Sequence, residues 1–189
     1  LQSRRYGVLL LVLALCCLGL RFDTSVMQYD GEFRFALPEL TEHADFIQAV
    51  TVPYDNFSRV DLLLASFNRE NHGFADFGIV DEHGKPLVWQ SFALSEVKDN
   101  QFFQFSFPPI RDSAGKYYYV YLRGGKGNAP GNAITAWGAH DINKLPTVYS
   151  AKGEHKGALN CKFFCKQPPW LLCIGFAVAG VLLLLCSLW

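Results

Sequence analysis

Apolar residues are concentrated at the two ends of the chain, and between them apolar and polar residues alternate in short runs. The first uncharged block is Tyr6 to Leu20, after Arg4-Arg5, and the last is Trp170 to Trp189. A helix rises about 1.5 Å per residue, and the hydrocarbon core of a bilayer is about 30 Å thick. The last block therefore predicts a transmembrane helix. The first is somewhat short unless flanking residues snorkel or the bilayer thins.

The N-terminal block allows two interpretations, a cleaved signal peptide and an uncleaved signal anchor. The small-x-small pattern of a cleavage site is poorly matched, with Cys17-Leu18-Gly19 as the nearest approach, so we favour the anchor. Arg4 and Arg5 predict a cytoplasmic N-terminus and a central region outside the membrane, whereas basic residues at the inner ends of the two blocks favour the reverse. We follow the N-terminal pair because the first segment usually sets the orientation.

The region between the blocks shows no sustained helical period, and its short apolar runs separated by turn residues are typical of strands. The turn at Asp81–Gly84 predicts a hairpin, and Pro108-Pro109 is expected to end a strand with one apolar face. This spacing predicts an antiparallel β-sandwich of jelly-roll type. The predicted strands are 33–37, 46–52, 60–67, 74–80, 87–92, 102–107, 117–122, 133–137, 147–150 and 158–164.

The predicted fold class is an all-β antiparallel sandwich of jelly-roll type flanked by two transmembrane α-helices. Its parts are an N-terminal signal anchor (1–21), an extracytoplasmic sandwich (22–167) and a C-terminal transmembrane helix (168–189). Cys161 and Cys165 are about 13 Å apart on a strand, too far for a disulfide. A domain without a disulfide framework favours a bacterial or archaeal envelope. We expect a two-pass protein of the bacterial inner membrane with a periplasmic central domain.

Composition and charge exclude several classes of protein. Of the 189 residues 50% are hydrophobic and 18% are charged, so the chain is not a disordered linker. The 17 basic and 17 acidic residues give a formal net charge of zero, and the basic residues form no stripe. Both features argue against a nucleic-acid partner. The histidines, cysteines, carboxylates and serines match no zinc or catalytic pattern. We expect no enzymatic activity, no cofactor and no metal, although a structural Ca²⁺ on loop oxygens remains open.

Candidate binding residues lie in one polar loop and at two tryptophans. The loop gathers hydrogen-bonding side chains between two predicted strands, and the tryptophans are candidates for stacking on a sugar. The alternatives are an ordinary polar loop and tryptophans packed in the core. In the last apolar block, Gly175 and Ala179 are four apart, a spacing that permits close helix packing. The candidate glycan-binding residues are Asn68, Arg69, Asn71, His72, Trp89 and Trp137.

Five segments together resemble a β-sandwich module of bacterial envelope proteins: Val52–Asp61, Asp99–Gln101, Phe105–Tyr118, Val148–Tyr149 and Ala158–Phe164. Such modules are similar to galactose-binding-type jelly rolls and occur beside membrane-embedded glycosyltransferases and other polysaccharide-biosynthesis proteins. The likeness covers roughly residues 30 to 165, and its motifs are mostly structural. The multi-helix catalytic portion found beside such modules is missing from this sequence, so the resemblance implies the module alone.

Two functions compete on this evidence. The first is a non-catalytic, membrane-anchored accessory subunit: integral membrane partners dock through both helices in the bilayer, and the sandwich braces a respiratory, photosynthetic, transport or polysaccharide complex. The second is a glycan- or glycolipid-binding module for envelope polysaccharide assembly. We favour the first, and an enzyme is a distant third. An exposed tryptophan in a groove beside Asn or Arg would favour the second, whereas burial of both Trp89 and Trp137 would count against it.

Overall fold

The structure is a computed structural model that describes residues 2–29, 33–140, 147–150, 153–155 and 157–186. The chain divides into two compact units. One contains the terminal segments Leu1–Thr24 and Cys165–Trp189, and the other contains Ser25–Phe164. Each unit is described by itself.

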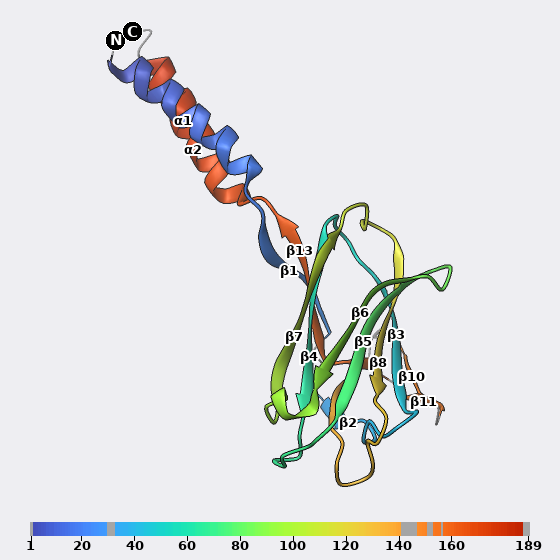
Figure 1. The fold of residues 1–189 in the computed structure, drawn as a ribbon. Coiled ribbons are helices and arrows are strands. Elements are labelled where there is room, and N and C mark those ends of the chain that lie inside the picture. Colours follow the sequence, from blue (N-terminus) through green and yellow to red (C-terminus); the bar gives the residue numbers. More distant parts are fainter. Residues whose placement is uncertain (1, 30–32, 141–146, 151–152, 156, 187–189) are drawn as a thin grey trace. The chain divides into compact units, whose positions relative to one another are not determined.

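Two helices and a series of short strands make up the fold of the described residues (Figure 1). A single short 3-10 turn, Leu94–Glu96, interrupts the strands in the described part of the chain. In chain order the elements are α1 (Gln2–Gly19), β1 (Phe22–Tyr29), β2 (Phe33–Ala36), β3 (Asp45–Thr51), β4 (Phe57–Ala65), β5 (Phe74–Asp81), β6 (Pro86–Ala93), β7 (Gln101–Ile110), β8 (Tyr117–Gly124), β9 (Thr135–His140), β10 (Val148–Ser150), β11 (Gly153–His155), β12 (Ala158–Leu159), β13 (Cys161–Gln167) and α2 (Trp170–Cys186).

The strands form a two-sheet antiparallel sandwich. A seven-stranded sheet has the order β1-β13-β4-β9-β12, with β2 paired to β9 and β7 paired to β4. A six-stranded sheet has the order β11-β10-β3-β8-β5-β6. The predicted hairpin around Asp81–Gly84 is confirmed, because β5 and β6 pair antiparallel on either side of it. The segment between β4 and β5 passes from one sheet to the other, so the 68–72 loop is a crossover at one end of the sandwich.

The core lies between the two sheets and is rich in aromatic rings. Buried and more exposed residues alternate along β3 and β8, because successive side chains of a strand face opposite sides of the sheet. The buried residues point into the core. Phe77 of the six-stranded sheet stacks on Phe105 of the seven-stranded sheet, with ring centroids 4.1 Å apart. Phe57 meets Phe107 edge to face at 5.1 Å. Each such buried side chain stabilises the fold by about 1.5–3 kcal/mol relative to exposure.

The predicted fold class, a β-sandwich flanked by two transmembrane helices, is wrong about the helices. Among the described residues, neither helix combines the length and the apolar character needed to cross a bilayer. Helix α1 includes Arg4 and Arg5 in its first turns. The 17 described residues of α2 rise only about 26 Å, against a hydrocarbon core of about 30 Å. Residues 187–189 of the predicted span lie outside the described part.

Three further expectations depended on those spans and are corrected with them. The two-pass location in the bacterial inner membrane is wrong as predicted, and so is the docking of integral membrane partners through both helices. The classification of the chain as a membrane protein with transmembrane helices is not supported by either helix. The β-sandwich between the helices does not depend on them.

Helices α1 and α2 pack against each other as an antiparallel pair through two glycines. A Cβ at Gly7 would lie 2.8 Å from Leu184 Cγ, and a Cβ at Gly180 would lie 2.9 Å from the carbonyl oxygen of Gly7. The missing side chains therefore let the two backbones approach closely. Of the two residues that the sequence suggested for this packing, Ala179 is half-buried. Gly175 is exposed, and a Cβ added there would meet no atom within 4 Å.

The expected end of a strand at Pro108-Pro109 is wrong, because β7 continues to Ile110. Proline lacks an N–H and is tolerated in edge strands and at bulges. In the described part of the sheet β7 pairs only with β4, and the register of that pair shifts between Phe57 and Arg59. The two prolines thus occupy the irregular part of an edge strand.

Candidate functional site

The outer face of the six-stranded sheet carries a row of five residues, four with large side chains and one glycine, that crosses five strands. Directly opposite residues in an antiparallel ladder point to the same face. Five residues on β10, β3, β8, β5 and β6 therefore lie side by side, each directly opposite the next. Their pairings are Tyr149↔Ile47, Ile47↔Tyr121, Tyr121↔Gly78 and Gly78↔Trp89. We call this set the aromatic row. The inward neighbours on β3, β5 and β8 are buried, so the row faces away from the core.

The indole of Trp89 lies against Gly78, which has no side chain to displace it. A Cβ at Gly78 would overlap the six-membered ring of the indole. Tyr121 lies beside the indole with ring centroids 6.3 Å apart, and the Arg123 guanidinium is 5.4 Å from the indole centroid. Trp89 is nevertheless 43% exposed, and Tyr149 at the other end of the row is 47% exposed. The row thus presents accessible ring surface at both ends, and at one end Gly78, Tyr121 and Arg123 surround the Trp89 ring.

A row of polar side chains runs parallel to the aromatic row, two residues away along each strand. Asp45 pairs with Arg123, Arg123 with Asp76, and Asp76 with Ser91. We call these four residues the polar row. The Arg123 guanidinium lies 3.9 Å from the Asp45 carboxylate, and the Ser91 hydroxyl donates to the Asp76 carboxylate. Two residues of strand separate the rows by about 6.6 Å.

More aromatic surface continues on the opposite side of the aromatic row. Tyr119 and Tyr117 of β8 follow Tyr121 on the same face, with their rings edge to face at 5.5 Å. Tyr117 is 41% exposed and Leu87 of β6 is 38% exposed. The aromatic face, defined as the aromatic row together with Tyr117 and Tyr119, is therefore bordered on one side by the polar row.

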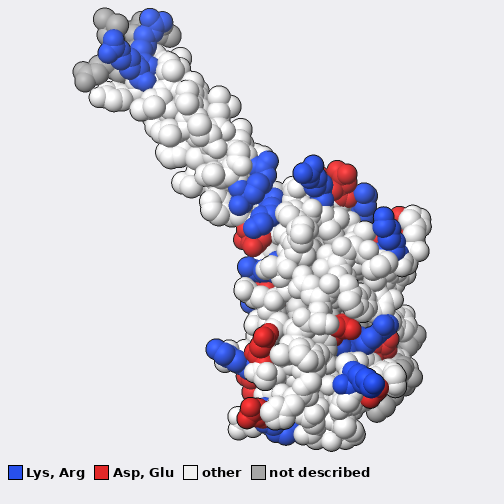
Figure 2. All heavy atoms as spheres, in the orientation of Figure 1, with Lys and Arg blue, Asp and Glu red and all other residues white. Residues whose placement is uncertain are grey.

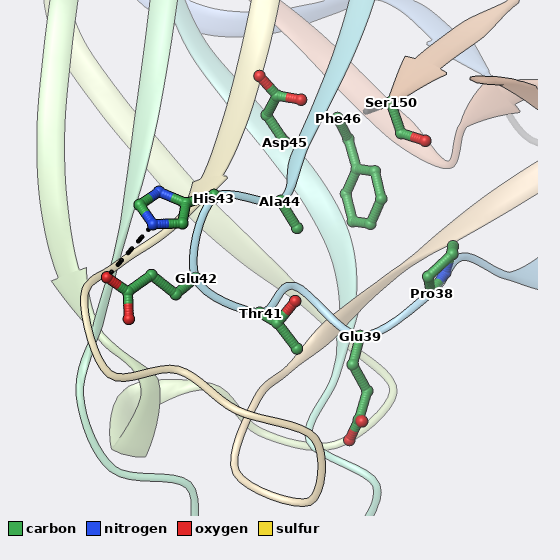
Figure 3. A pocket seen from close by; sticks show the side chains of 9 residues that line it. All are labelled: Pro38, Glu39, Thr41, Glu42, His43, Ala44, Asp45, Phe46 and Ser150. Carbon is green, nitrogen blue, oxygen red and sulfur yellow. Dashed lines mark ion pairs between the residues drawn. The ribbon is translucent and has the colours of Figure 1, made fainter. Parts of the chain in front are cut away.

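A cavity of about 150 Å³ opens beside the Asp45 end of the polar row. Figure 3 shows the carboxylates of Glu39 and Glu42 at one side of it and the side chains of Asp45 and Ser150 at the other. The His43 Nε2 lies 3.6 Å from the Glu42 carboxylate. Pockets that enclose a drug-sized ligand hold about 300–1,000 Å³, so this cavity is a local extension of the face.

The carboxylate of Glu39 is held in place by two donors. Arg69 donates to it at 2.5 Å, and the Gly131 N–H lies 3.2 Å from each of its oxygens. The hydrogen bond from Arg69, followed by that from Gly131, outweighs desolvation and lowers the pKa of Glu39. Glu39 therefore stays ionised at neutral pH, and the Arg69 guanidinium balances its charge.

The predicted 68–72 loop is bonded mainly to the protein itself. Arg69 also donates to the carbonyl oxygen of Ala133 at 3.0 Å. Asn71 is buried, and its amide donates to the carbonyl oxygen of Ser66. The His72 N–H donates to the Asn132 side chain at 2.8 Å, and the Asn132 amide donates back to the His72 carbonyl at 3.0 Å. These bonds fix the loop, in which Asn68 adopts a positive φ of 54° and is exposed.

Trp137 belongs to the other sheet and does not join Trp89. It lies on β9, is half-buried, and donates from its indole nitrogen to the Asn100 side chain at 2.8 Å. The structure therefore separates the six candidate glycan-binding residues into three places. Trp89 is on the aromatic face, Trp137 is on the seven-stranded sheet, and Asn68, Arg69, Asn71 and His72 are in the crossover loop.

Sequence reasoning missed most of the aromatic face. Tyr117, Tyr119 and Tyr121 recur with period two before Arg123, which places these four residues on one side of a strand. That signal was available in the sequence. The register that brings Tyr149 and Trp89 into line with Tyr121 was not, because it depends on the pairing of strands far apart in the chain.

Charge and metal chemistry add little to this surface. On the side of the sandwich seen in Figure 2, the described basic and acidic side chains are interspersed and form no extended patch of one sign. Within the described ranges, no group of three or more His, Cys, Asp or Glu side chains is arranged to hold a metal ion.

The sequence matches no protein-family model, and no curated protein is significantly similar to it. The features that bear on function are therefore the aromatic face and the polar row.

Proposed function

We propose that this protein is a non-catalytic binding module that binds carbohydrate on the aromatic face of its six-stranded sheet. The observation that carries the proposal is the pair of parallel rows, one of ring faces and one of hydrogen-bonding groups, on an accessible sheet surface. Trp89 and Tyr149 mark the two exposed ends of the aromatic row.

Carbohydrate suits this pairing because a pyranose ring has two kinds of surface. Its C–H bonds form apolar patches that pack on the π face of an aromatic ring. Its hydroxyl groups project from the ring edge, where they donate to carboxylates and accept from guanidinium groups. On this sheet, Trp89 and Tyr121 offer the first kind of contact, and Asp76 and Arg123 offer the second.

A protein partner fits the same surface less well. The cores of protein interfaces are depleted of charged residues, and the polar groups form a rim around them. Here Asp45, Arg123 and Asp76 run alongside the rings across the width of the face rather than around it. The accessory-subunit hypothesis also loses its main support, which was docking through two membrane-spanning helices.

The resemblance to modules found beside polysaccharide-biosynthesis proteins supports the same class of ligand. It does not identify the position of the binding site. The 68–72 loop is the weaker candidate because Arg69, Asn71 and the His72 backbone already bond to neighbouring groups.

The test is affinity electrophoresis of the full chain in gels that contain neutral polysaccharides: β-glucan, mannan, galactan and xylan. At least one polymer should retard the unmodified protein. Trp89→Ala should reduce the retardation by removing a ring face. Gly78→Ala should also reduce it, because the added Cβ displaces the indole while the backbone of β5 tolerates alanine. Loss of one stacked aromatic contact predicts affinity about tenfold lower.

Trp137→Phe is the matched control, since Trp137 lies on the other sheet and is outside the proposed site. It should bind as the unmodified protein does. If no neutral polysaccharide retards the chain, or if the Trp89 variant binds as well as the control, the proposed function is wrong.

A further inference from the structure

We infer that the ligand is an extended, uncharged polysaccharide that lies across the strands, along the aromatic row. This inference rests on the proposed function and narrows its ligand class. It follows from three properties of the surface: the length of the aromatic row, the position of the polar row, and the sign of the charge beside it.

The aromatic row is long and accessible at both ends. It crosses five strands, and four inter-strand spacings of about 4.8 Å give a length of about 19 Å. That length exceeds a single sugar ring and accommodates several in succession. Trp89 and Tyr149 stand at its ends with nearly half of each side chain exposed. A site for one terminal sugar would instead be a closed pocket around a single ring.

The polar row fixes the orientation of the chain. It runs parallel to the aromatic row at about 6.6 Å, which is close to the half-width of a sugar ring plus a hydrogen bond. A chain lying along the aromatic row therefore presents one edge of successive rings to Ser91, Asp76 and Arg123. A chain parallel to the strands would meet the polar row only once.

The charge beside the row selects against acidic polymers. The polar row has two carboxylates and one guanidinium, so its formal charge is negative, and the Arg123 guanidinium lies beside one of those carboxylates, that of Asp45. Glu42 in the adjoining cavity adds negative charge at the Asp45 end, whereas the charge of Glu39 is balanced by Arg69. Carboxylates of a uronic-acid chain lying across the strands would fall within about 8 Å of these groups, the screening distance at physiological ionic strength.

The first arm of the experiment is a length series on the full chain. Oligosaccharides of two, four and six sugars are prepared from the neutral polysaccharide that retards the protein, and their affinities are measured by isothermal titration calorimetry. Affinity should rise by about tenfold or more from the disaccharide to the hexasaccharide, because each added ring gains a further contact. A disaccharide that binds as tightly as the hexasaccharide would overturn the extended-chain inference.

The second arm compares charge. Polygalacturonate should bind at least about tenfold more weakly than the neutral polymer of similar length. Asp76→Asn keeps the shape and the acceptor for Ser91 but removes one negative charge. It should raise the ratio of polygalacturonate affinity to neutral-polymer affinity several-fold. Glu96→Gln makes the same change of net charge in the exposed 3-10 turn between β6 and β7 and should leave that ratio unchanged.

The outcomes separate the two levels of the proposal. If polygalacturonate and the neutral polymer bind equally well, and Asp76→Asn does not change the ratio of their affinities, the inference of an uncharged ligand is overturned. The proposal that carbohydrate binds on the aromatic face is not affected by that result. If the chain binds protein ligands through Trp89 but binds no polysaccharide, both the proposed carbohydrate-binding function and the inference about its ligand are overturned.

Discussion

Two tryptophans of similar appearance in the sequence have different surroundings in the fold. Trp89 rests on a glycine and keeps 43% of its surface exposed, whereas the Trp137 indole is half-buried and bonded to Asn100. Trp89 is exposed and lies close to an arginine, Arg123, but on the sheet face rather than in the expected groove. No pattern in the sequence distinguishes the two, because the difference lies in the residue opposite each ring.

Glu39 makes stability dependent on pH. Its pKa is lowered by Arg69, so the folded state binds a proton at this carboxylate less readily than the unfolded chain does. The contribution is present above the ordinary carboxyl pKa of about 4.3 and is lost as the pH falls through the lower pKa of the folded state. Glu39→Gln should therefore reduce the free energy of unfolding at neutral pH, and the difference from the unmodified protein should shrink in acid.

Urea unfolding at a series of pH values measures this difference. Glu96→Gln is the control, since Glu96 is exposed, and its stability should follow that of the unmodified protein. A deficit in Glu39→Gln that stays constant down to strongly acidic pH would contradict the assigned role of Arg69.

The strands were predicted best where apolar and polar residues alternate without interruption along the sequence. The runs at 46–52, 74–80, 87–92 and 117–122 correspond to β3, β5, β6 and β8, because alternating burial is what a two-layer sandwich imposes. The errors have local causes. Two prolines stay in strand β7 because β7 itself bulges there, with the four steps from Ser106 to Ile110 facing two steps of β4. Strands β1 and β11 were not predicted because neither has a clear apolar alternation.

The contact between α1 and α2 predicts a difference between two glycines of the same helix. Gly180→Leu should push the helices apart, because its side chain would meet the backbone of Gly7 and the side chain of Leu11. Gly175→Leu adds the same side chain where no atom lies within 4 Å, so it should be tolerated. Hydrogen exchange of the α1 amides should accelerate in the Gly180 variant alone. Equal exchange in both variants would contradict this packing.

At the scale of the whole molecule, the candidate site is a product of topology. The aromatic row brings together residues from 47 to 149, on strands whose order in the sheet differs from their order in the chain. The sequence predicted the sandwich, and it predicted one site residue, Trp89. It did not predict the face, because register between distant strands is set by packing of the whole core. It also predicted membrane spans, which the lengths of the described helices do not support.

We propose that carbohydrate binds across the outer face of the six-stranded sheet. The most direct measurement is amide and indole chemical-shift mapping of the labelled full chain, titrated with the hexasaccharide of the neutral polymer. The predicted result is a continuous set of shifts along β10, β3, β8, β5 and β6, including the Trp89 indole, while the Trp137 indole stays in place. Shifts confined to residues 68–72 and their partners, with Trp89 unmoved, would contradict the claim.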